Sequence, residues 1–350
     1  MSNKLFKSKF YSYAGTFLFI LFFIILFRDF LYTYRLQLEK FFPYYAYQDQ
    51  IIYYLTGDEN FDIEAPMNLR FLGLYIQFLI YKLIPCIELN HLVLGEYAYE
   101  NYVCATFSSA FMNYLSLCGI LSVTFVYCYR KLNLSTSESI LTVLLSYIFI
   151  NHVEAFTLDR ISILYFLIVL YFLDNKKTSL LLILCSAFVN EKIIYILAGL
   201  FFIRLFLNKK KEFKLYFFIT LLSGLLVLII FSIYAFLLNN GYYQSDHENG
   251  LYDTMFSQGL ERILKMFTTK SGLSNSSVPL LLSVIPYILS IKLKVNKFYY
   301  SNLDFLIPIS MLFFTTGGGM EQTGRYVMYT IPLWLPIFSQ QILILIKKNR

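Results

Sequence analysis

Residues 178–207 read TSLLLILCSAFVNEKIIYILAGLFFIRLFL, an apolar run of 30 residues that Asn190, Glu191 and Lys192 interrupt. A membrane-spanning helix needs about 20 residues, so this run is too long for a single span. The interruption predicts two short helices joined by a polar hairpin at membrane depth. Polar, irregular backbone is tolerated there only where protein buries it or where it lines a cavity. We therefore treat the three interrupting residues as candidates for a functional site.

The composition of the whole chain also favours membrane helices. Hydrophobic residues make up 58% and charged residues 15%, whereas soluble domains are about 45–50% apolar and about 25% charged. The apolar runs do not alternate as the strands of a membrane barrel do. The sequence predicts an all-α, polytopic transmembrane protein with about ten spans in one integral-membrane domain, residues 1–350. The net charge of +7 comes from basic residues that bracket apolar runs and does not indicate nucleic-acid binding.

Ten apolar segments are the predicted spans. The first is interpreted as an uncleaved span, because its apolar core is too long for a signal peptide and no small-x-small cleavage site follows it. The segments are residues 12–28, 103–128, 137–152, 160–174, 178–190, 192–207, 214–238, 278–294, 303–318 and 326–346.

Basic clusters predict the orientation of these spans. With ten crossings, six clusters that hold 17 of the 29 Lys and Arg residues all fall on one side, which the positive-inside rule assigns to the cytoplasm. Both termini are then cytoplasmic, and the acidic residues gather on the outer side. The clusters are Lys4/Lys7/Lys9, Arg130/Lys131, Lys176/Lys177, Lys209–Lys211 with Lys214, Lys292/Lys294/Lys297 and Lys347/Lys348/Arg350.

Residues 71–86, FLGLYIQFLIYKLIPC, are apolar enough to cross the membrane, but a crossing there would reverse the side of two later basic clusters. We therefore predict an outer-face helix that is interfacial or re-entrant, with Lys82 snorkelling to the surface. Two long outer loops, 29–102 and 239–277, are predicted on the same face.

The five cysteines lie in or beside apolar runs, and their spacing matches no metal site. We interpret them as buried free thiols. The alternative for two of them is an outward-facing Cys86–Cys104 disulfide.

The first outer loop contains the polar stretch YYAYQDQIIYYLTGDENFDIEAPMNLR, residues 44–70. Asp49 has the chemistry of a general base for an acceptor hydroxyl, or it is a solvated loop carboxylate. The acidic run Asp58–Glu64, which includes Asp62, has the oxygen ligands that hard cations prefer, or it is a solvated loop. Arg70 suits bidentate binding of phosphate or carboxylate, or it pairs with its acidic neighbours.

Two further pairs of charged residues lie at predicted span boundaries. Asp159 and Arg160 either balance each other at a helix start, where an acidic residue suits the helix dipole, or contribute to a site. Glu321 and Arg325 follow three glycines and precede a span with prolines, which places Arg325 where it can contact a lipid phosphate or an ordinary headgroup.

Together these motifs resemble the GT-C superfamily of integral-membrane glycosyltransferases, which take a sugar from a polyprenyl-phosphate carrier on the extracytoplasmic face. The resemblance is loose at each point but extends over nearly the whole chain. No Asp-x-Asp or Glu-x-Asp pair stands at Asp49, and Asp62-Ile63-Glu64 is the nearest equivalent. The matching features are Asp49 in an aromatic setting, Arg70 before an apolar helix ending at Pro85, Asn190-Glu191-Lys192 in a hairpin, and Glu321 to Arg325 before Pro332 and Pro336.

The resemblance implies direct displacement at the anomeric carbon with inversion. Asp49 would be the base, with Asp62 as its main rival, and Arg70, Lys192 and Arg325 would stabilise the phosphate leaving group. Members differ in metal dependence, so the resemblance predicts no metal ligands and is compatible with a divalent cation. The implied catalytic set is Asp49, Asp62 and Glu191, and the implied substrate-binding set is Arg70, Asp159, Arg160, Asn190, Lys192, Glu321 and Arg325.

The implied partners are a polyprenyl-phosphate-linked sugar, a glycan, lipid or protein acceptor, and the lipids of a bacterial inner membrane. An O-antigen or capsule repeat-unit polymerase is the first alternative, because it also uses polyprenyl-linked sugars at the outer face. A transporter or flippase without covalent chemistry is the second. Transporters often have paired broken helices, and the break near residue 190 has no visible counterpart in the other half of the chain.

Overall fold

The computed structural model divides the opening apolar run into α8 (Lys176–Cys185), a 3₁₀ turn η3 (Ser186–Phe188) and α9 (Glu191–Asn208). The predicted break at Asn190 is therefore present. The structure describes residues 2–40, 71–84, 100–150, 159–208, 211–239, 264–265, 268–270, 273, 277–293, 301–311 and 327–348.

Within these ranges the secondary structure is helical and contains no strand. Apart from the elements of the opening run, the helices are α1 (Ser2–Ile25), α2 (Phe27–Lys40), α4 (Phe71–Leu83), α5 (Glu100–Arg130), α6 (Thr136–Ile150), α7 (Asp159–Phe172), α10 (Lys211–Asn239), α14 (Val278–Leu289), η5 (Asn302–Phe305), α15 (Leu306–Ser310) and α17 (Ile331–Lys348). The all-helical class is thus confirmed for the described residues.

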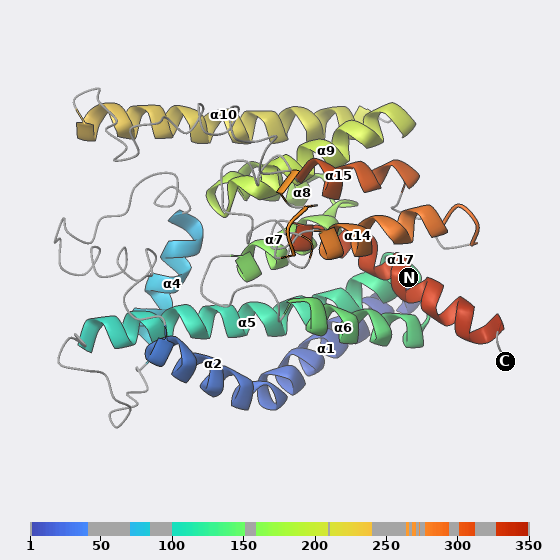
Figure 1. Ribbon diagram of the computed structural model, residues 1–350, viewed down its shortest axis with the longest axis horizontal. Coiled ribbons are helices and arrows are strands. Elements are labelled where there is room, and N and C mark those ends of the chain that lie inside the picture. The colour runs from blue at the N-terminus through green and yellow to red at the C-terminus, as the bar shows by residue number, and fades with distance from the viewer. Residues whose placement is uncertain are drawn as a thin grey trace.

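Helix α5 is the centre of the packing, and α10 lies at one edge (Figure 1). The apolar window of α5 is 72% buried, and the helix contacts α1, α2, α4, α6 and α7. The corresponding window of α10 is only 17% buried, because this helix packs on α8 and α9 along one side alone. Leu225, Leu228 and Ile229 of α10 are exposed large apolar side chains.

The described helices do not support ten full spans. Only the segments Val103–Arg130 and Glu212–Ile230 are long and apolar enough to cross a membrane. Helix α8 has 10 residues and α7 has 14; at 1.5 Å per residue these reach about 15 and about 21 Å, short of the roughly 30 Å hydrocarbon core. The apolar runs predicted helices near the right residues. The length of an apolar run, however, overestimated the length of the helix that forms there.

Several helix ends that carry basic residues lie at one end of the molecule. Both termini and the ends of α5 and α17 are on the same side in Figure 1. Lys131, after α5, forms an ion pair with Asp174 in the α7–α8 turn, and Arg130 donates a hydrogen bond of 2.7 Å to the Tyr171 hydroxyl. This common end is the arrangement that the basic clusters predict; its assignment to the cytoplasm stays a prediction.

The described part of the region expected to be the first outer loop, residues 29–40 and 71–84, is helical. Helix α2 continues almost directly from α1 past Arg28 and Asp29, so the loop does not begin at residue 29. A charged pair ends an apolar segment without ending the helix. Helix α2 continues because Phe30 and Tyr34 bury their rings, with Phe107 of α5 edge-on to both.

Helix α4 lies within residues 71–86, as predicted, and its axis runs across α5 in Figure 1. It buries Leu74, Gln77 and Ile80 on the side toward α5 and exposes Lys82, whose ammonium lies 5.7 Å from the centre of the Phe78 ring. Whether this helix is interfacial or re-entrant stays a prediction.

The cysteines divide between the two interpretations. Cys118 and Cys128 are buried free thiols and Cys185 is a partly buried one. Cys104, near the start of α5, is disulfide-bonded, as the alternative interpretation expected for this residue; Cys86 lies outside the described residues.

Candidate functional site

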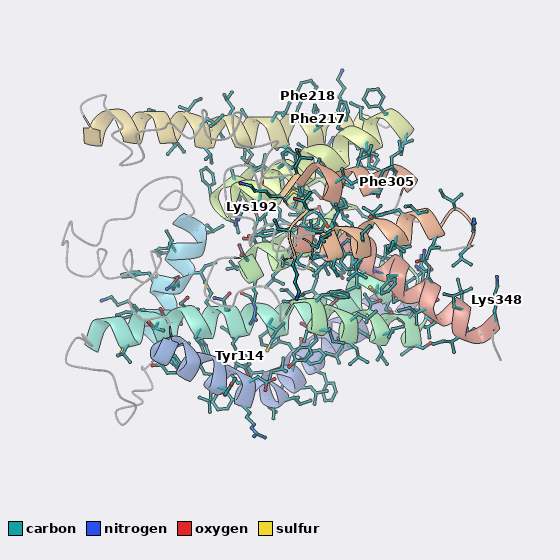
Figure 2. The ribbon with its side chains drawn as sticks, in the orientation of Figure 1. Tyr114, Lys192, Phe217, Phe218, Phe305 and Lys348 are labelled. Atoms are coloured by element: carbon teal, nitrogen blue, oxygen red, sulfur yellow. The ribbon has the colours of Figure 1, made fainter. Side chains whose placement is uncertain are left out.

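Three helix starts meet around a buried polar cluster. Asp159 begins α7, Asn190 and Lys192 flank the start of α9, and Tyr329 precedes α17. Asp159, Asn190 and Tyr329 are 0% exposed and Lys192 is 6% exposed. Figure 2 places Lys192 within the body of the molecule, whereas Phe218 points outward from α10. Charged groups this deeply buried are costly unless other polar groups compensate them.

A chain of hydrogen bonds joins the cluster. The Asn190 side-chain amide donates to the Ser162 hydroxyl at 3.1 Å and to the Tyr329 hydroxyl at 3.1 Å. The Tyr329 hydroxyl in turn donates to Oδ1 of Asp159. Because a phenol both donates and accepts, Tyr329 can connect the amide to the carboxylate. One tyrosine thereby links α7, the α8–α9 break and the turn before α17.

Asn190 also explains why the helix restarts where it does. Its side-chain oxygen accepts a hydrogen bond of 3.1 Å from the backbone N–H of Lys192, two residues further on. This is the bond of an N-cap residue, which satisfies one of the free N–H groups at a helix start. The backbone N–H of Ile193 then donates to the Asn190 carbonyl. The residue that interrupts the apolar run therefore caps α9 and orients Lys192.

The Lys192 ammonium is held by charge and by an aromatic face rather than by a direct hydrogen bond to the carboxylate. Its Nζ lies 4.0 Å from Oδ1 of Asp159, beyond the usual hydrogen-bond range of about 2.7–3.2 Å. The same nitrogen lies 5.3 Å from the centre of the Tyr329 ring, within cation–π range. Asp159 and Tyr329 together position the cation in a largely dry environment.

Arg160 adds a second buried cation beside Asp159 in the chain. The residue is 8% exposed, and its Nε atom is buried without a hydrogen-bond partner. Neighbouring residues of a helix do not face each other, and the Arg160 guanidinium lies near Tyr147 of α6. The cation that pairs with Asp159 inside the cluster is therefore Lys192. The starts of α7 and α9 thus each carry a buried cation, Arg160 and Lys192, and basic side chains of this kind are suited to an anionic ligand such as phosphate.

The structure brings together part of the predicted site. Asp159, Asn190 and Lys192 lie in one cluster, and Arg160 follows Asp159 in α7. Glu191 begins α9, and its side chain is not described. The other predicted residues, Asp49, Asp62, Arg70, Glu321 and Arg325, lie outside the described residues.

The sequence did not single out Tyr329 or Ser162. The chain contains 31 tyrosines, so residue type alone carries no signal, and Tyr329 is identifiable only through its contacts. Ser162 is three residues after Asp159, on the same helix face, and an expected inward face of α7 would have indicated it.

A second buried ion pair was also missed. Arg204 of α9 makes two hydrogen bonds to the Asp304 carboxylate, of 3.0 and 2.7 Å, in a bidentate arrangement. Asp304 also accepts a hydrogen bond from the backbone N–H of Ser301, which completes a capping box at η5. The pair therefore joins α9 to η5. A charged residue inside the predicted span 192–207 was the available signal.

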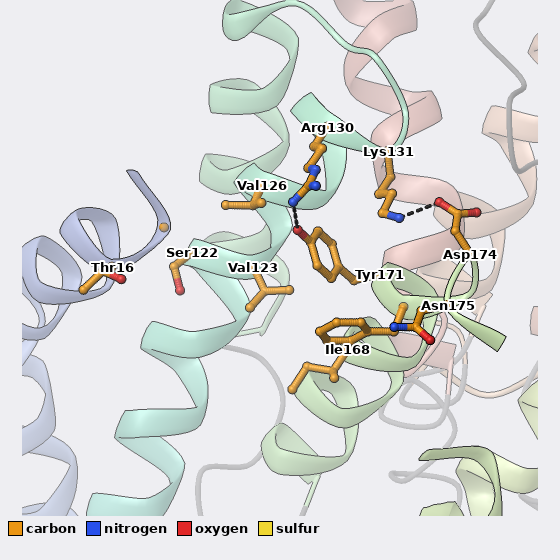
Figure 3. Close-up of a pocket in the computed structure, with 12 residues that line it drawn as sticks. Thr16, Ser122, Val123, Val126, Arg130, Lys131, Ile168, Tyr171, Asp174 and Asn175 are labelled. Carbon is orange, nitrogen blue, oxygen red and sulfur yellow. Dashed lines mark hydrogen bonds and ion pairs between the residues drawn. The ribbon is translucent and has the colours of Figure 1, made fainter. Parts of the chain in front are cut away.

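Among the described residues, no group of three or more His, Cys, Asp and Glu side chains has the arrangement of a metal site. A cavity of about 580 Å³ lies elsewhere, between α1, α5 and the α7–α8 turn (Figure 3). None of the cluster residues lines it. No family model matches the chain, and no curated protein or solved structure matches it either.

Proposed function

We propose that the protein is an integral-membrane glycosyltransferase that moves a sugar from a polyprenyl-phosphate carrier to an acceptor on the extracytoplasmic face, with inversion. The observation that carries this proposal is the buried cluster in which Lys192 is oriented by Asp159 and Tyr329. A phosphate leaving group gains negative charge as the glycosidic bond breaks. Preoriented cations in a dry site stabilise such charge far better than water does.

Membrane placement is part of the proposal. Exposed large apolar side chains occur along α1, α10 and α14, including Phe17, Leu228 and Leu281. Surfaces of this kind suit contact with lipid. The two ends of α5 also differ: Cys104 near its start is disulfide-bonded, whereas Arg130 ends it. Disulfides persist in oxidising compartments and basic residues are enriched on the cytoplasmic side, so both signals favour the same orientation.

In this proposal the chain has about ten spans in total, as the apolar runs predict. Two are the long apolar helices, and shorter helices form the others. The starts of α7 and α9 then lie on the outer side, because the α7–α8 turn is at the basic end. Lys192 of the cluster would bind the donor phosphate, and Arg160, beside the cluster in the chain, would supply a second basic group. Asp49, or its rival Asp62, would remove the proton from the acceptor hydroxyl.

The other candidate residues complete the proposed site. Glu191 would orient sugar hydroxyls. Arg70 and Arg325 would add positive charge at the phosphate, and Glu321 would contribute to binding the substrate.

The test is sugar transfer by the purified full chain in proteoliposomes with polyprenyl-phosphate monosaccharides, measured as release of polyprenyl phosphate and labelling of the acceptor. We expect Lys192→Met to lower the rate by roughly 10²- to 10³-fold, the usual effect of losing one group that stabilises developing charge. Lys177→Met is the matched control, because Lys177 is exposed in the first turn of α8. It should retain the wild-type rate.

Removing Lys192 alone also leaves Asp159 buried without its cation, which threatens folding. The double variant Asp159→Asn, Lys192→Met keeps the local charge balanced and should fold while remaining slow. A folded double variant with the wild-type rate would show that the cluster is not part of the site. Wild-type protein that requires an oligosaccharide-diphosphate lipid would instead be a repeat-unit polymerase.

The break between α8 and α9 also favours a transporter as the second candidate. Transporters use interrupted helices, and buried ionisable residues, to bind substrates near the middle of the membrane. The same proteoliposomes separate the two functions. Movement of a lipid-linked sugar across the bilayer without any covalent product would identify a transporter.

A further inference from the structure

The cavity of about 580 Å³ lies far from the buried cluster along α7. The helix starts at Asp159 in the cluster, and Tyr171, close to its end, lines the cavity. A helix of 14 residues is about 21 Å long at 1.5 Å per residue. The cavity therefore belongs to the end of the molecule where basic residues gather, not to the proposed transfer site. Its volume falls within the roughly 300–1,000 Å³ that is usual for small-molecule sites.

The lining of this cavity is amphipathic. Val123, Val126 and Ile168 give it an apolar wall, and Arg130 and Lys131 stand at its polar end (Figure 3). Gly15 of α1 lines the cavity too, and an added Cβ there would lie 3.2 Å from Val126. Helices α1 and α5 therefore approach each other closely at Gly15, on one side of the cavity.

One tyrosine orients both cations. The Tyr171 hydroxyl accepts a hydrogen bond from Arg130, and the Lys131 ammonium lies 5.3 Å from the centre of the Tyr171 ring. Lys131 also pairs with Asp174, whose side chain is 59% exposed. The Lys131 side chain itself is only 16% exposed, so it stays at the cavity wall while Asp174 faces solvent, and a ligand phosphate would share Lys131 with Asp174 or displace it. With two cations and one carboxylate, the ionisable lining has an excess of positive charge.

We propose that this cavity binds one anionic phospholipid, with its phosphate on Arg130 and Lys131 and its acyl chain along Val123, Val126 and Ile168. Basic pockets between helices on the cytoplasmic side are suited to acidic lipid headgroups. A lipid fits better than a soluble phosphate ester because the apolar wall adjoins α1, where Phe17 is exposed to the surroundings. The inference rests on the membrane placement in the proposed function and not on glycosyl transfer.

The test is native mass spectrometry of the full chain in a non-ionic detergent, titrated with phosphatidylglycerol or with phosphatidylcholine of the same acyl length. We expect one phosphatidylglycerol to bind in preference to phosphatidylcholine. Arg130→Gln, Lys131→Gln should weaken its binding roughly 10- to 30-fold, as expected for losing two basic contacts to an acidic lipid. The control Lys347→Gln, Lys348→Gln removes the same charge at the same end from exposed residues of α17 that do not line the cavity. This control should leave binding within about twofold of wild type. If the protein attracted the lipid only through its overall surface charge, both double variants would weaken binding by the same factor.

A second variant tests the apolar wall without changing charge. Ile168→Trp fills the cavity and should lower phosphatidylglycerol binding, with thermal unfolding in detergent confirming that the variant folds. Glycerol phosphate, which has no acyl chain, should not compete. Three results would each overturn the inference: equal weakening of phosphatidylglycerol binding in the two double variants, equal binding of phosphatidylcholine and phosphatidylglycerol by the wild type, or full competition by glycerol phosphate. If the protein transfers sugar normally but binds no phosphatidylglycerol, the lipid site is wrong and the proposed function stands. If it binds phosphatidylglycerol but transfers no sugar, only the proposed function is wrong.

Discussion

Tyr329 shows why the cluster is sensitive to single atoms. Its hydroxyl joins the Asn190 amide to the Asp159 carboxylate by hydrogen bonds, and its ring faces the Lys192 ammonium. The ring stabilises the Lys192 ammonium through its aromatic face. The hydroxyl forms hydrogen bonds with two buried polar groups, the Asn190 amide and the Asp159 carboxylate. These two contributions can be separated by a substitution that removes the hydroxyl and keeps the ring.

We expect Tyr329→Phe to lower the free energy of unfolding by about 1–3 kcal/mol, because a donor on Asn190 and an acceptor on Asp159 lose a buried partner. The measurement is thermal or denaturant unfolding in detergent. Tyr75→Phe is the control, because Tyr75 is 56% exposed on α4, and its effect should stay within about 0.5 kcal/mol. An equal, small effect in both variants would mean that the hydroxyl bond to Asp159 is not formed.

At this scale the sequence predicted the residues that interrupt apolar runs and missed those that do not. Asn190 and Lys192 are conspicuous because their neighbours are apolar. Tyr329 is not, since tyrosine fits an apolar run, and its role depends on a contact with Asn190 across 139 positions of the chain. Local sequence carries no information on such a contact.

At the scale of elements, the position of the break between α8 and α9 followed from length and polarity, but the packing of α5 against α7 did not. Gly119 of α5 lies against Leu164 of α7, where an added Cβ would be 2.8 Å from the leucine Cδ2 atom. The two helices therefore approach each other closely at Gly119, a residue that the sequence pattern does not distinguish. A glycine inside an apolar run is ambiguous until the facing helix is known.

This contact gives a prediction with a built-in reference. In helices, replacing Gly by Ala stabilises by up to about 1 kcal/mol through propensity alone. Gly224→Ala should show that gain, since its Cβ would lie 3.5 Å from Ile194, an ordinary contact distance. Gly119→Ala forces the end of the Leu164 side chain to move, so it should lose most of that gain and be less stable than Gly224→Ala by about 1 kcal/mol.

The measurement is the difference in unfolding midpoint between the two glycine variants in one detergent. Adding Leu164→Ala to Gly119→Ala relieves the clash while itself creating space, so the two changes should be non-additive. Strict additivity would mean that α5 and α7 do not touch at Gly119.

At the scale of the molecule, the all-helical class followed from the apolar runs, while the number of full spans did not, and the orientation that the basic clusters predict stays a prediction. The clusters record only on which side a chain segment lies, and Figure 1 has the corresponding described ends together. Apolar length, by contrast, cannot distinguish a helix that crosses from a short one that packs inside the bundle. Helix α8, with 10 residues against a predicted span of 178–190, illustrates the difference.

The predicted topology depends on whether α4 crosses the membrane. If it stays at the outer face, residues 60 and 95 lie on one side of the membrane; if it crosses, they lie on opposite sides. We expect Asn60→Cys and Gly95→Cys, each in a chain whose free cysteines are replaced by alanine, to react with a membrane-impermeant maleimide added outside intact cells. Lys348→Cys should react only after the cells are opened, because the basic end is predicted to be cytoplasmic. Labelling of residue 60 outside with residue 95 protected would make α4 a span. It would also place Arg130 and the cavity beside it on the outer face, where the common basic end would contradict the positive-inside rule.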